Sequence, residues 1–161
     1  MNNVELRQKA LENGLCEKWA IKWTDDWSVN NQLNALMSLD GMSFLAEKHF
    51  PSLGFILENA EGKHEQYGLL IKKTSDITLN TEMVKYHLCG CVCDVYLPKW
   101  WIGFLYLSHG SNVRIFAGEN VDCRLRMHRD STCVVATKGD GSDIIIEYLK
   151  DQYSDTKVQV S

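Results

Sequence analysis

The spacing of the apolar residues changes near residue 62. Before that point apolar side chains recur every three or four residues, which is typical of amphipathic helices. After it they alternate with polar side chains, which is typical of strands. This change predicts a helical N-terminal segment, residues 1–62, and a β-rich segment, residues 63–151, with strands up to about residue 150. Residues 152–161 have little to bury and are predicted to form a flexible tail.

The helical segment carries several start and stop signals. Val4 to Asn13 has a helical pattern, and Gly14 follows it as a typical C-terminal stop. Ser28 and Ser52 each precede an apolar run and are expected to be N-caps. Asp40-Gly41 is expected to interrupt the helix that Ser28 begins. Helices this short need to pack on one another or on a sheet to persist.

Three tryptophans in this segment follow helical spacing. Trp19, Trp23 and Trp27 lie four residues apart and, with Cys16 and Ala20, form one stripe of an amphipathic helix. Such a stripe could act as a stacking platform for a ligand. More often each ring buries about 200 Å² in a core, so we expect these tryptophans to be core residues.

The β-rich segment consists of short strands that recur roughly every 8 to 12 residues. Turn clusters such as His109-Gly110-Ser111-Asn112 and Gly139-Asp140-Gly141-Ser142-Asp143 separate them. Trp101 to Leu107 is apolar on both faces, which predicts a buried central strand. Two units of about ten residues make one flattened, two-sided coil, so we expect an α+β protein whose second part is a β-solenoid or β-roll. An antiparallel β-sandwich or meander is the alternative.

Several short motifs occur in order along the chain, followed by repeats of small residues with Val and Ile: Gly14-Leu15-Cys16-x-x-Trp19, Asp40-Gly41-Met42-Ser43-Phe44, Phe50-Pro51-Ser52-x-x-Phe55-Ile56 and Gly62-x5-Gly68. This order resembles an uncharacterised group of gut-bacterial proteins that are often found near prophage or mobile-element genes. The resemblance implies a helical N-terminal part, a β-solenoid-like C-terminal part, and no assigned activity or site residues. The sequence departs from the group at Leu45, where a cysteine is common, and in its spacing after Gly118.

Composition narrows the function classes. The chain has 161 residues and a net charge of −4, which argues against a dedicated nucleic-acid binder. No apolar run approaches the roughly 20 residues that span a bilayer, and the first residues lack the layout of a secretory signal. Six cysteines without an export signal are expected to be reduced thiols. These features predict a cytoplasmic protein without a membrane partner.

The run His87-Leu88-Cys89-Gly90-Cys91-Val92-Cys93 is the one candidate metal site. On a single strand His87, Cys89, Cys91 and Cys93 would face the same way, and thiolates with imidazole suit zinc. Alternate side chains on a strand lie almost 7 Å apart, however, which is too far for a tetrahedral ligand set. We interpret these cysteines as small apolar residues on an inner sheet face and expect no metal and no other cofactor.

Two further groups are candidates for surface contacts. Only one of the adjacent rings of Trp100 and Trp101 can point inward, so the other is expected to contact a protein partner or a second copy of the chain. A basic ladder that could bind a polyanion is formed by Arg124, Arg126, His128 and Arg129. The negative net charge makes nucleic acid an unfavourable partner for it.

Hydrolase triads could be assembled from the turn residues Ser108, His109, Ser111, His128, Asp130 and Ser131, but none lies in a nucleophile-elbow motif.

We therefore expect a non-enzymatic structural or interaction protein, with a phage or mobile-element role implied by the resemblance alone. One alternative is a thiol- or metal-binding protein that uses the face from His87 to Cys93. Another is a binder of anionic carbohydrate or nucleic acid through Arg124 and Arg126.

Overall fold

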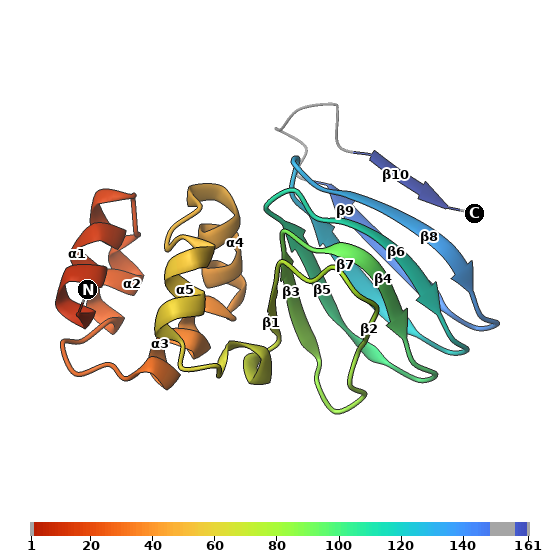
Figure 1. The fold of residues 1–161 in the computed structure, drawn as a ribbon, viewed down its shortest axis with the longest axis horizontal. Helices are drawn as coiled ribbons and strands as arrows, with labels where there is room; N and C mark the ends of the chain where they lie inside the picture. Colours follow the sequence, from red (N-terminus) through yellow and green to blue (C-terminus); the bar gives the residue numbers. More distant parts are fainter. Residues whose placement is uncertain (1, 149–156, 161) are drawn as a thin grey trace. The chain divides into compact units, whose positions relative to one another are not determined.

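The chain folds as an α+β protein with two compact units (Figure 1). The computed structural model describes residues 2–148 and 157–160. The first unit ends at Tyr67 and the second begins at Gly68. This division lies slightly beyond residue 62 because the short 3₁₀ helix η1 (His64–Tyr67) completes the helical unit.

The helical unit consists of short helices: α1 (Asn3–Glu12), α2 (Glu17–Lys22), α3 (Val29–Leu36), α4 (Leu39–Lys48) and α5 (Leu53–Asn59). The predicted N-caps are confirmed. The Ser28 hydroxyl accepts a hydrogen bond from the Asn31 backbone N–H, and the Ser52 hydroxyl accepts one from Phe55. Each bond satisfies an N–H that has no partner within its own helix.

The predicted interruption at Asp40-Gly41 is wrong. The chain breaks at Met37 and Ser38 instead, because the Ser38 hydroxyl caps α4 by accepting a hydrogen bond from the Gly41 N–H. Asp40 and Gly41 therefore belong to the first turn of α4. A Cβ atom on Gly41 would lie 1.9 Å from the carbonyl oxygen of Ala35, so only glycine lets α4 begin this close to the end of α3.

The second unit is the expected β-solenoid. One sheet has the order β1-β3-β5-β7-β9, and the other has the order β10-β8-β6-β4-β2 (Figure 1). The first sheet contains β1 (Leu69–Ile71), β3 (Lys85–Cys89), β5 (Ile102–Ser108), β7 (Asp122–Met127) and β9 (Asp143–Tyr148). The second contains β2 (Ile77–Thr78), β4 (Val92–Leu97), β6 (Asn112–Ala117), β8 (Thr132–Lys138) and β10 (Lys157–Val160).

Every pair of neighbouring strands is parallel, so the antiparallel alternative is wrong. Consecutive strands alternate between the two sheets, and two strands with their turns make one coil. The register pairs Ile102 with Asp122 and Val92 with Asn112, twenty residues further along the chain. The predicted units of about ten residues are thus the two halves of one coil. β5 occupies the centre of its sheet, as expected from its apolar sequence.

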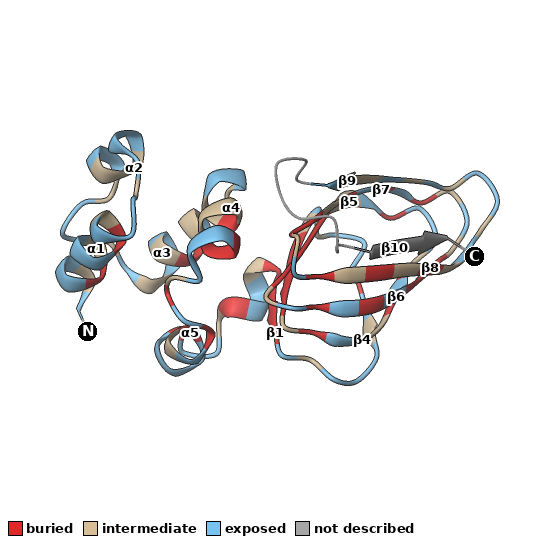
Figure 2. Ribbon diagram, turned by 90° about the horizontal axis from the view of Figure 1, so that it is seen from above, coloured by how far each residue is buried: buried red, intermediate tan, exposed pale blue. Residues whose placement is uncertain are grey.

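The inner faces of the two sheets form one apolar core. Leu88, Leu105 and Leu125 from the first sheet and Val95 and Ile115 from the second are fully buried. Buried residues, red in Figure 2, recur along the strands of both sheets. Cys91, Cys123 and Cys133 belong to this core, and Cys93 packs against it. The inner-face position predicted for the run from Cys89 to Cys93 thus holds for Cys91 and Cys93 but not for Cys89, and all six cysteines are free thiols.

Buried serines join successive coils at the corner where the first sheet passes into the second. The Ser111 hydroxyl accepts a hydrogen bond from the Cys91 N–H at 3.0 Å and donates to the carbonyl of Ser108 or Leu88. One coil later, the Ser131 hydroxyl accepts from the Ser111 N–H at 3.1 Å. The serines therefore satisfy backbone groups that the turns remove from the strand ladders.

The predicted flexible tail, residues 152–161, lies mostly outside the described residues. Lys157–Val160 is described and forms β10, which pairs in parallel with β8. Pairing with β8 gives the backbone of these four residues a hydrogen-bonded position in the sheet, and the flexibility of the tail stays a prediction.

Replacing Ser111 with alanine is expected to lower the free energy of unfolding of the solenoid by about 1–3 kcal/mol, because the Cys91 N–H loses its buried acceptor. Urea denaturation followed by circular dichroism measures the change. Ser75→Ala, at an exposed position of the same unit, is the matched control and should leave stability within about 0.5 kcal/mol. Equal effects of the two substitutions would contradict the role given to the Ser111 hydroxyl.

Candidate functional site

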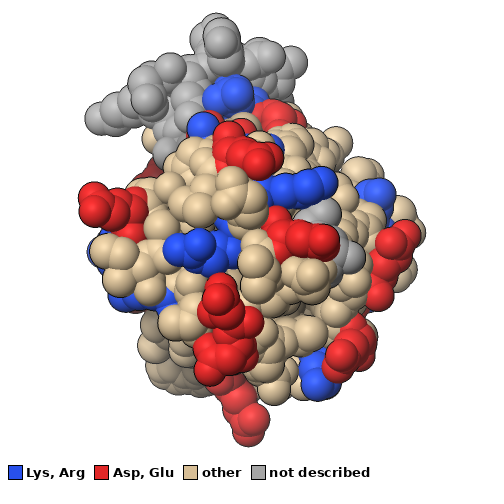
Figure 3. Space-filling view, turned by 90° about the vertical axis from the view of Figure 1, so that its left-hand side faces the viewer, with Lys and Arg blue, Asp and Glu red and all other residues tan. Residues whose placement is uncertain are grey.

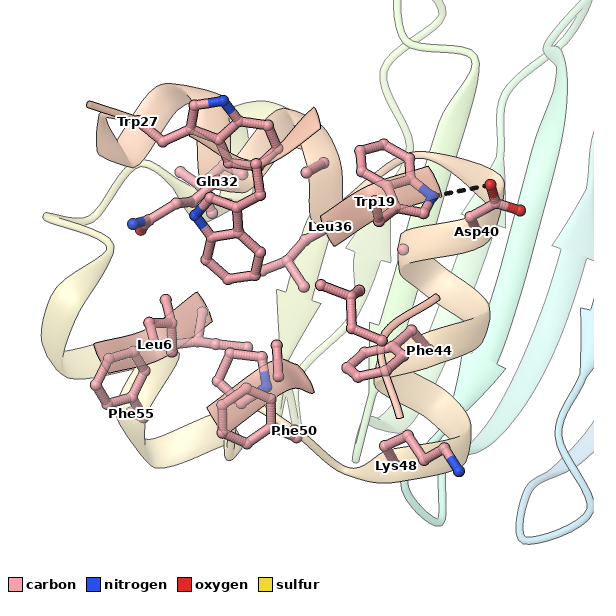
Figure 4. Close-up of a pocket in the computed structure, with 18 of the residues that line it drawn as sticks. Leu6, Trp19, Trp27, Gln32, Leu36, Asp40, Phe44, Lys48, Phe50 and Phe55 are labelled. Carbon is pink, nitrogen blue, oxygen red and sulfur yellow. Dashed lines mark hydrogen bonds between the residues drawn. The ribbon is translucent and has the colours of Figure 1, made fainter. Parts of the chain in front are cut away.

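The helical unit contains a cavity of about 400 Å³. Residues from α1 to α5 and from the connecting loops line it, so it lies between the helices, partly open to solvent, and is not a groove along one helix (Figure 4). Its wall includes every aromatic residue of positions 1–62: Trp19, Trp23, Trp27, Phe44, Phe50 and Phe55. All six side chains are only half-buried.

The tryptophans do not form the predicted helical stripe. α2 ends at Lys22, so Trp23 and Trp27 lie beyond it in extended and turn conformations. The residues that follow explain the end of the helix, because the Thr24 hydroxyl bonds to the Asp26 carboxylate. Such local bonds from Thr and Asp compete with helical hydrogen bonding. The expectation that the tryptophans are fully buried core residues is also wrong, since they face the cavity.

Hydrogen bonds fix two of the indole rings. The Trp23 Nε1 donates to Asn3 Oδ1 at 2.6 Å, and its ring stacks on Trp27 with 5.4 Å between centroids. The Trp19 Nε1 donates to Asp40 Oδ2 at 2.9 Å (Figure 4). Asn3 also accepts from the Gln32 side chain at 3.0 Å. These bonds hold the aromatic wall in place while it remains partly exposed to solvent.

Three charged residues line the cavity: Asp40, Glu47 and Lys48. Asp40 is exposed, and its pKa is lowered by the hydrogen bond from Trp19 and by Lys18, whose Nζ lies 3.2 Å from Asp40 Oδ2. Figure 3, which views the molecule from the side of α1 and α2, shows acidic and basic side chains interspersed.

A second cluster of functional groups lies at the corner of the solenoid, among the turn residues considered for hydrolase triads. Ser108 Oγ lies 2.7 Å from His87 Nε2 and 2.7 Å from His109 Nδ1. His128 Nδ1 lies 3.1 Å from Asp130 Oδ1. A serine within hydrogen-bond distance of an imidazole is the arrangement of a nucleophile and its base. Ser108 is fully buried, however, so the geometry favours a structural role.

Burial dominates the electrostatics of this corner. It lowers the pKa of His87 to about 3, with smaller contributions from His109 and His128. Burial alone would raise the pKa of Asp130, but hydrogen bonds from His128, the Gly110 backbone and Ser131 hold it well below its usual range. His87 is thus neutral near neutral pH, and Asp130 is ionised.

The run from His87 to Cys93 does not form one face. Gly90, with φ of +67°, turns the chain between β3 and β4, so Cys91 and Cys93 point into the core between the sheets while His87 and Cys89 do not. Within the described ranges, no three His, Cys, Asp or Glu side chains are grouped so as to hold a metal ion. Burial raises the pKa of Cys89 to about 12 and that of Cys93 to about 11, which favours unreactive, protonated thiols.

The predicted basic ladder is only partly available. Arg124 is exposed, but Arg126 pairs with Glu147 at 3.2 Å. His128 is 2% exposed and bonded to Asp130, and Arg129 is half-buried with an interaction partner. The prediction that these residues form one solvent-exposed ladder is therefore wrong at His128, because the side chain lies at a corner where it is covered.

The adjacent tryptophans separate as predicted. Trp101 is fully buried in the solenoid core, and its Nε1 donates to the Met83 carbonyl at 2.9 Å. It is therefore not an interface residue. Trp100 is 63% exposed, with Lys99 Nζ 6.0 Å from its ring centroid. A partner contact through Trp100 stays a prediction.

The cavity itself was not anticipated from the sequence. Composition gave no signal for it, because the six aromatic residues of positions 1–62 match the 10% aromatic content of the whole chain. Lys48 gave no signal, because a lone lysine near the end of a helix is common.

No protein-family model, curated protein or solved structure matches this chain. The resemblance to prophage-associated proteins therefore stays a prediction. Among the residues that the structure describes, no helix combines the length and the apolar character needed to cross a bilayer.

His87 is expected to make the solenoid less stable in mild acid. The unfolded chain binds a proton at His87 near pH 6.5, whereas the folded chain binds it only near pH 3, so stability falls as the pH drops below 6.5. From about pH 7 to about pH 5 this loss is about 2 kcal/mol. Urea denaturation at the two pH values measures it.

His87→Gln should remove most of that pH dependence, and His49→Gln, at an exposed position of the helical unit, should retain it. Proton NMR of the wild-type histidine rings provides a second measurement that does not depend on the variant folding. A His87 ring that titrates above pH 6 would contradict the burial assigned to it.

Proposed function

We propose that this is a non-enzymatic binding protein whose helical unit holds an apolar small molecule. One observation carries the proposal: all six aromatic side chains of residues 1–62 surround a single cavity, and none of them is fully buried. Its volume of about 400 Å³ is within the range of small-molecule sites. A bound apolar molecule would remove these rings from water, at about 25 cal/mol per Å² of apolar surface.

The form of the cavity favours a small molecule over a partner helix. A groove for a helix is an open channel along the surface, lined at intervals of three and four residues. Here all of the helices contribute to the wall, and the rings point inward from several directions (Figure 4). The polar atoms in the wall mostly bond to the protein itself, as Trp19 does to Asp40.

The solenoid is assigned the role of a rigid scaffold within this proposal. Its parallel coils are joined by backbone ladders and by the serine bonds at the corner. A place in a prophage or mobile element belongs to the same proposal and rests on the resemblance of the sequence alone. The alternatives receive less support, because Cys89 and Cys91 are buried with raised pKa values and Arg126 is already paired.

A fluorescent apolar dye tests the proposal. 8-Anilinonaphthalene-1-sulfonate should bind the wild-type protein at one site with enhanced fluorescence. Ser43→Phe places a ring in the cavity from α4 and should weaken binding by about tenfold or more, because the dye loses the space beside the aromatic wall. Fluorescence titration measures both affinities.

Trp100→Ala is the matched control, since it removes an exposed indole outside the cavity, and it should leave the affinity unchanged. Circular dichroism checks that both variants fold. Unchanged binding in Ser43→Phe, or loss of binding in Trp100→Ala, would place the dye elsewhere and contradict the proposal.

A further inference from the structure

The lining of the cavity is predominantly apolar. Of its three charged residues, Asp40 is compensated by Lys18 and by the indole N–H of Trp19. Glu47 has an interaction partner of its own. Among the described residues Lys48 has no ion-pair partner. Its ammonium group is therefore available to pair with a charged group of a ligand.

Lys48 is placed at the border of the cavity. It is the last residue of α4 and lies four positions after Phe44, so the two side chains share one face of the helix. In Figure 4 the aliphatic part of Lys48 lies on the same side of the cavity as Phe44, and its ammonium group points outward. A long cationic side chain commonly lies with its stem along apolar surface and its charge in water.

Gly14 lies beside the ammonium group of Lys48. A Cβ atom at Gly14 would lie 3.7 Å from Lys48 Nζ, and the φ of Gly14 is +92°, a conformation that favours glycine. Lys48 is exposed and also lines the cavity, so an anionic group can approach its ammonium group while the rest of the molecule extends into the cavity.

We propose, on the basis of the binding function proposed above, that the ligand is a small monocarboxylate with a long apolar body. Its body packs against the six aromatic rings, and its carboxylate pairs with Lys48. A charge-assisted hydrogen bond of this kind adds affinity and fixes the direction in which the molecule enters. A cationic molecule of the same length is repelled by the ammonium group and binds more weakly.

Three ligands with the same twelve-carbon chain test the proposal: dodecanoate, dodecan-1-ol and dodecyltrimethylammonium. Isothermal titration calorimetry at neutral pH, below the micelle concentrations, should show dodecanoate binding about tenfold more tightly than dodecan-1-ol. Dodecyltrimethylammonium should bind more weakly than both. Lys48→Gln should remove the advantage of dodecanoate without changing the affinity for dodecan-1-ol, and Lys48→Arg should retain the advantage.

Lys9→Gln is the matched control, because Lys9 is also a lysine in the last turn of a helix but does not line the cavity. It should leave all three affinities unchanged. If dodecan-1-ol binds and dodecanoate binds no more tightly, or if the advantage survives in Lys48→Gln, the carboxylate proposal is wrong while cavity binding stands. If none of the three ligands binds, the proposed function is wrong as well.

Discussion

The helical unit depends on an imbalance between its aromatic side chains and the helices available to cover them. Helices of six to ten residues present only two or three turns each, and six large rings converge on the space between them. The space between them is a pocket of about 400 Å³ that is partly open to solvent. Two of the rings are fixed in their half-exposed positions by hydrogen bonds from Trp19 to Asp40 and from Trp23 to Asn3. That unfavourable exposure is what makes the cavity a candidate site.

The solenoid buries the apolar side chains on the inner faces of its two sheets, while others such as Val92, Trp100 and Ile102 stay exposed on its outside. Each coil adds two strands, and the next coil pairs with both in parallel. The inner faces meet in one core, and the corners use Ser111, Ser131 and a glycine turn at Gly90 to satisfy the backbone. The buried His87 and Ser108 belong to this corner architecture, and their burial argues against reading them as a catalytic pair.

Much of the fold could be predicted from the sequence, since local signals determine it. Ser28 and Ser52 marked helix starts, and the ten-residue spacing of strands and turns indicated a two-sided coil. The predictions that proved wrong concern positions where a single residue determines whether the backbone turns. Gly90 converts an apparently continuous strand into two strands in different sheets, which separates Cys89 from Cys91. Asp40-Gly41 looked like a break, but the Ser38 cap begins a helix through it.

The candidate site was harder to predict than the fold. Helical spacing placed Trp19, Trp23 and Trp27 on one stripe, but α2 ends at Lys22 and the last two rings reach the cavity from a loop. The contribution of Lys48 depends on its position beside Gly14, which lies far away in the sequence. The position of the two loop tryptophans and the position of Lys48 both arise from tertiary packing, so the spacing of residues along the chain does not predict them.

Fluorine NMR of the protein labelled with 5-fluorotryptophan tests the central claim most directly, because the chain has five tryptophans and only three line the cavity. Addition of dodecan-1-ol should shift the resonances of Trp19, Trp23 and Trp27 and leave those of Trp100 and Trp101 in place. Single Trp→Phe substitutions assign the five signals. A shift confined to Trp100, or no shift at concentrations that saturate an apolar site, would contradict the account.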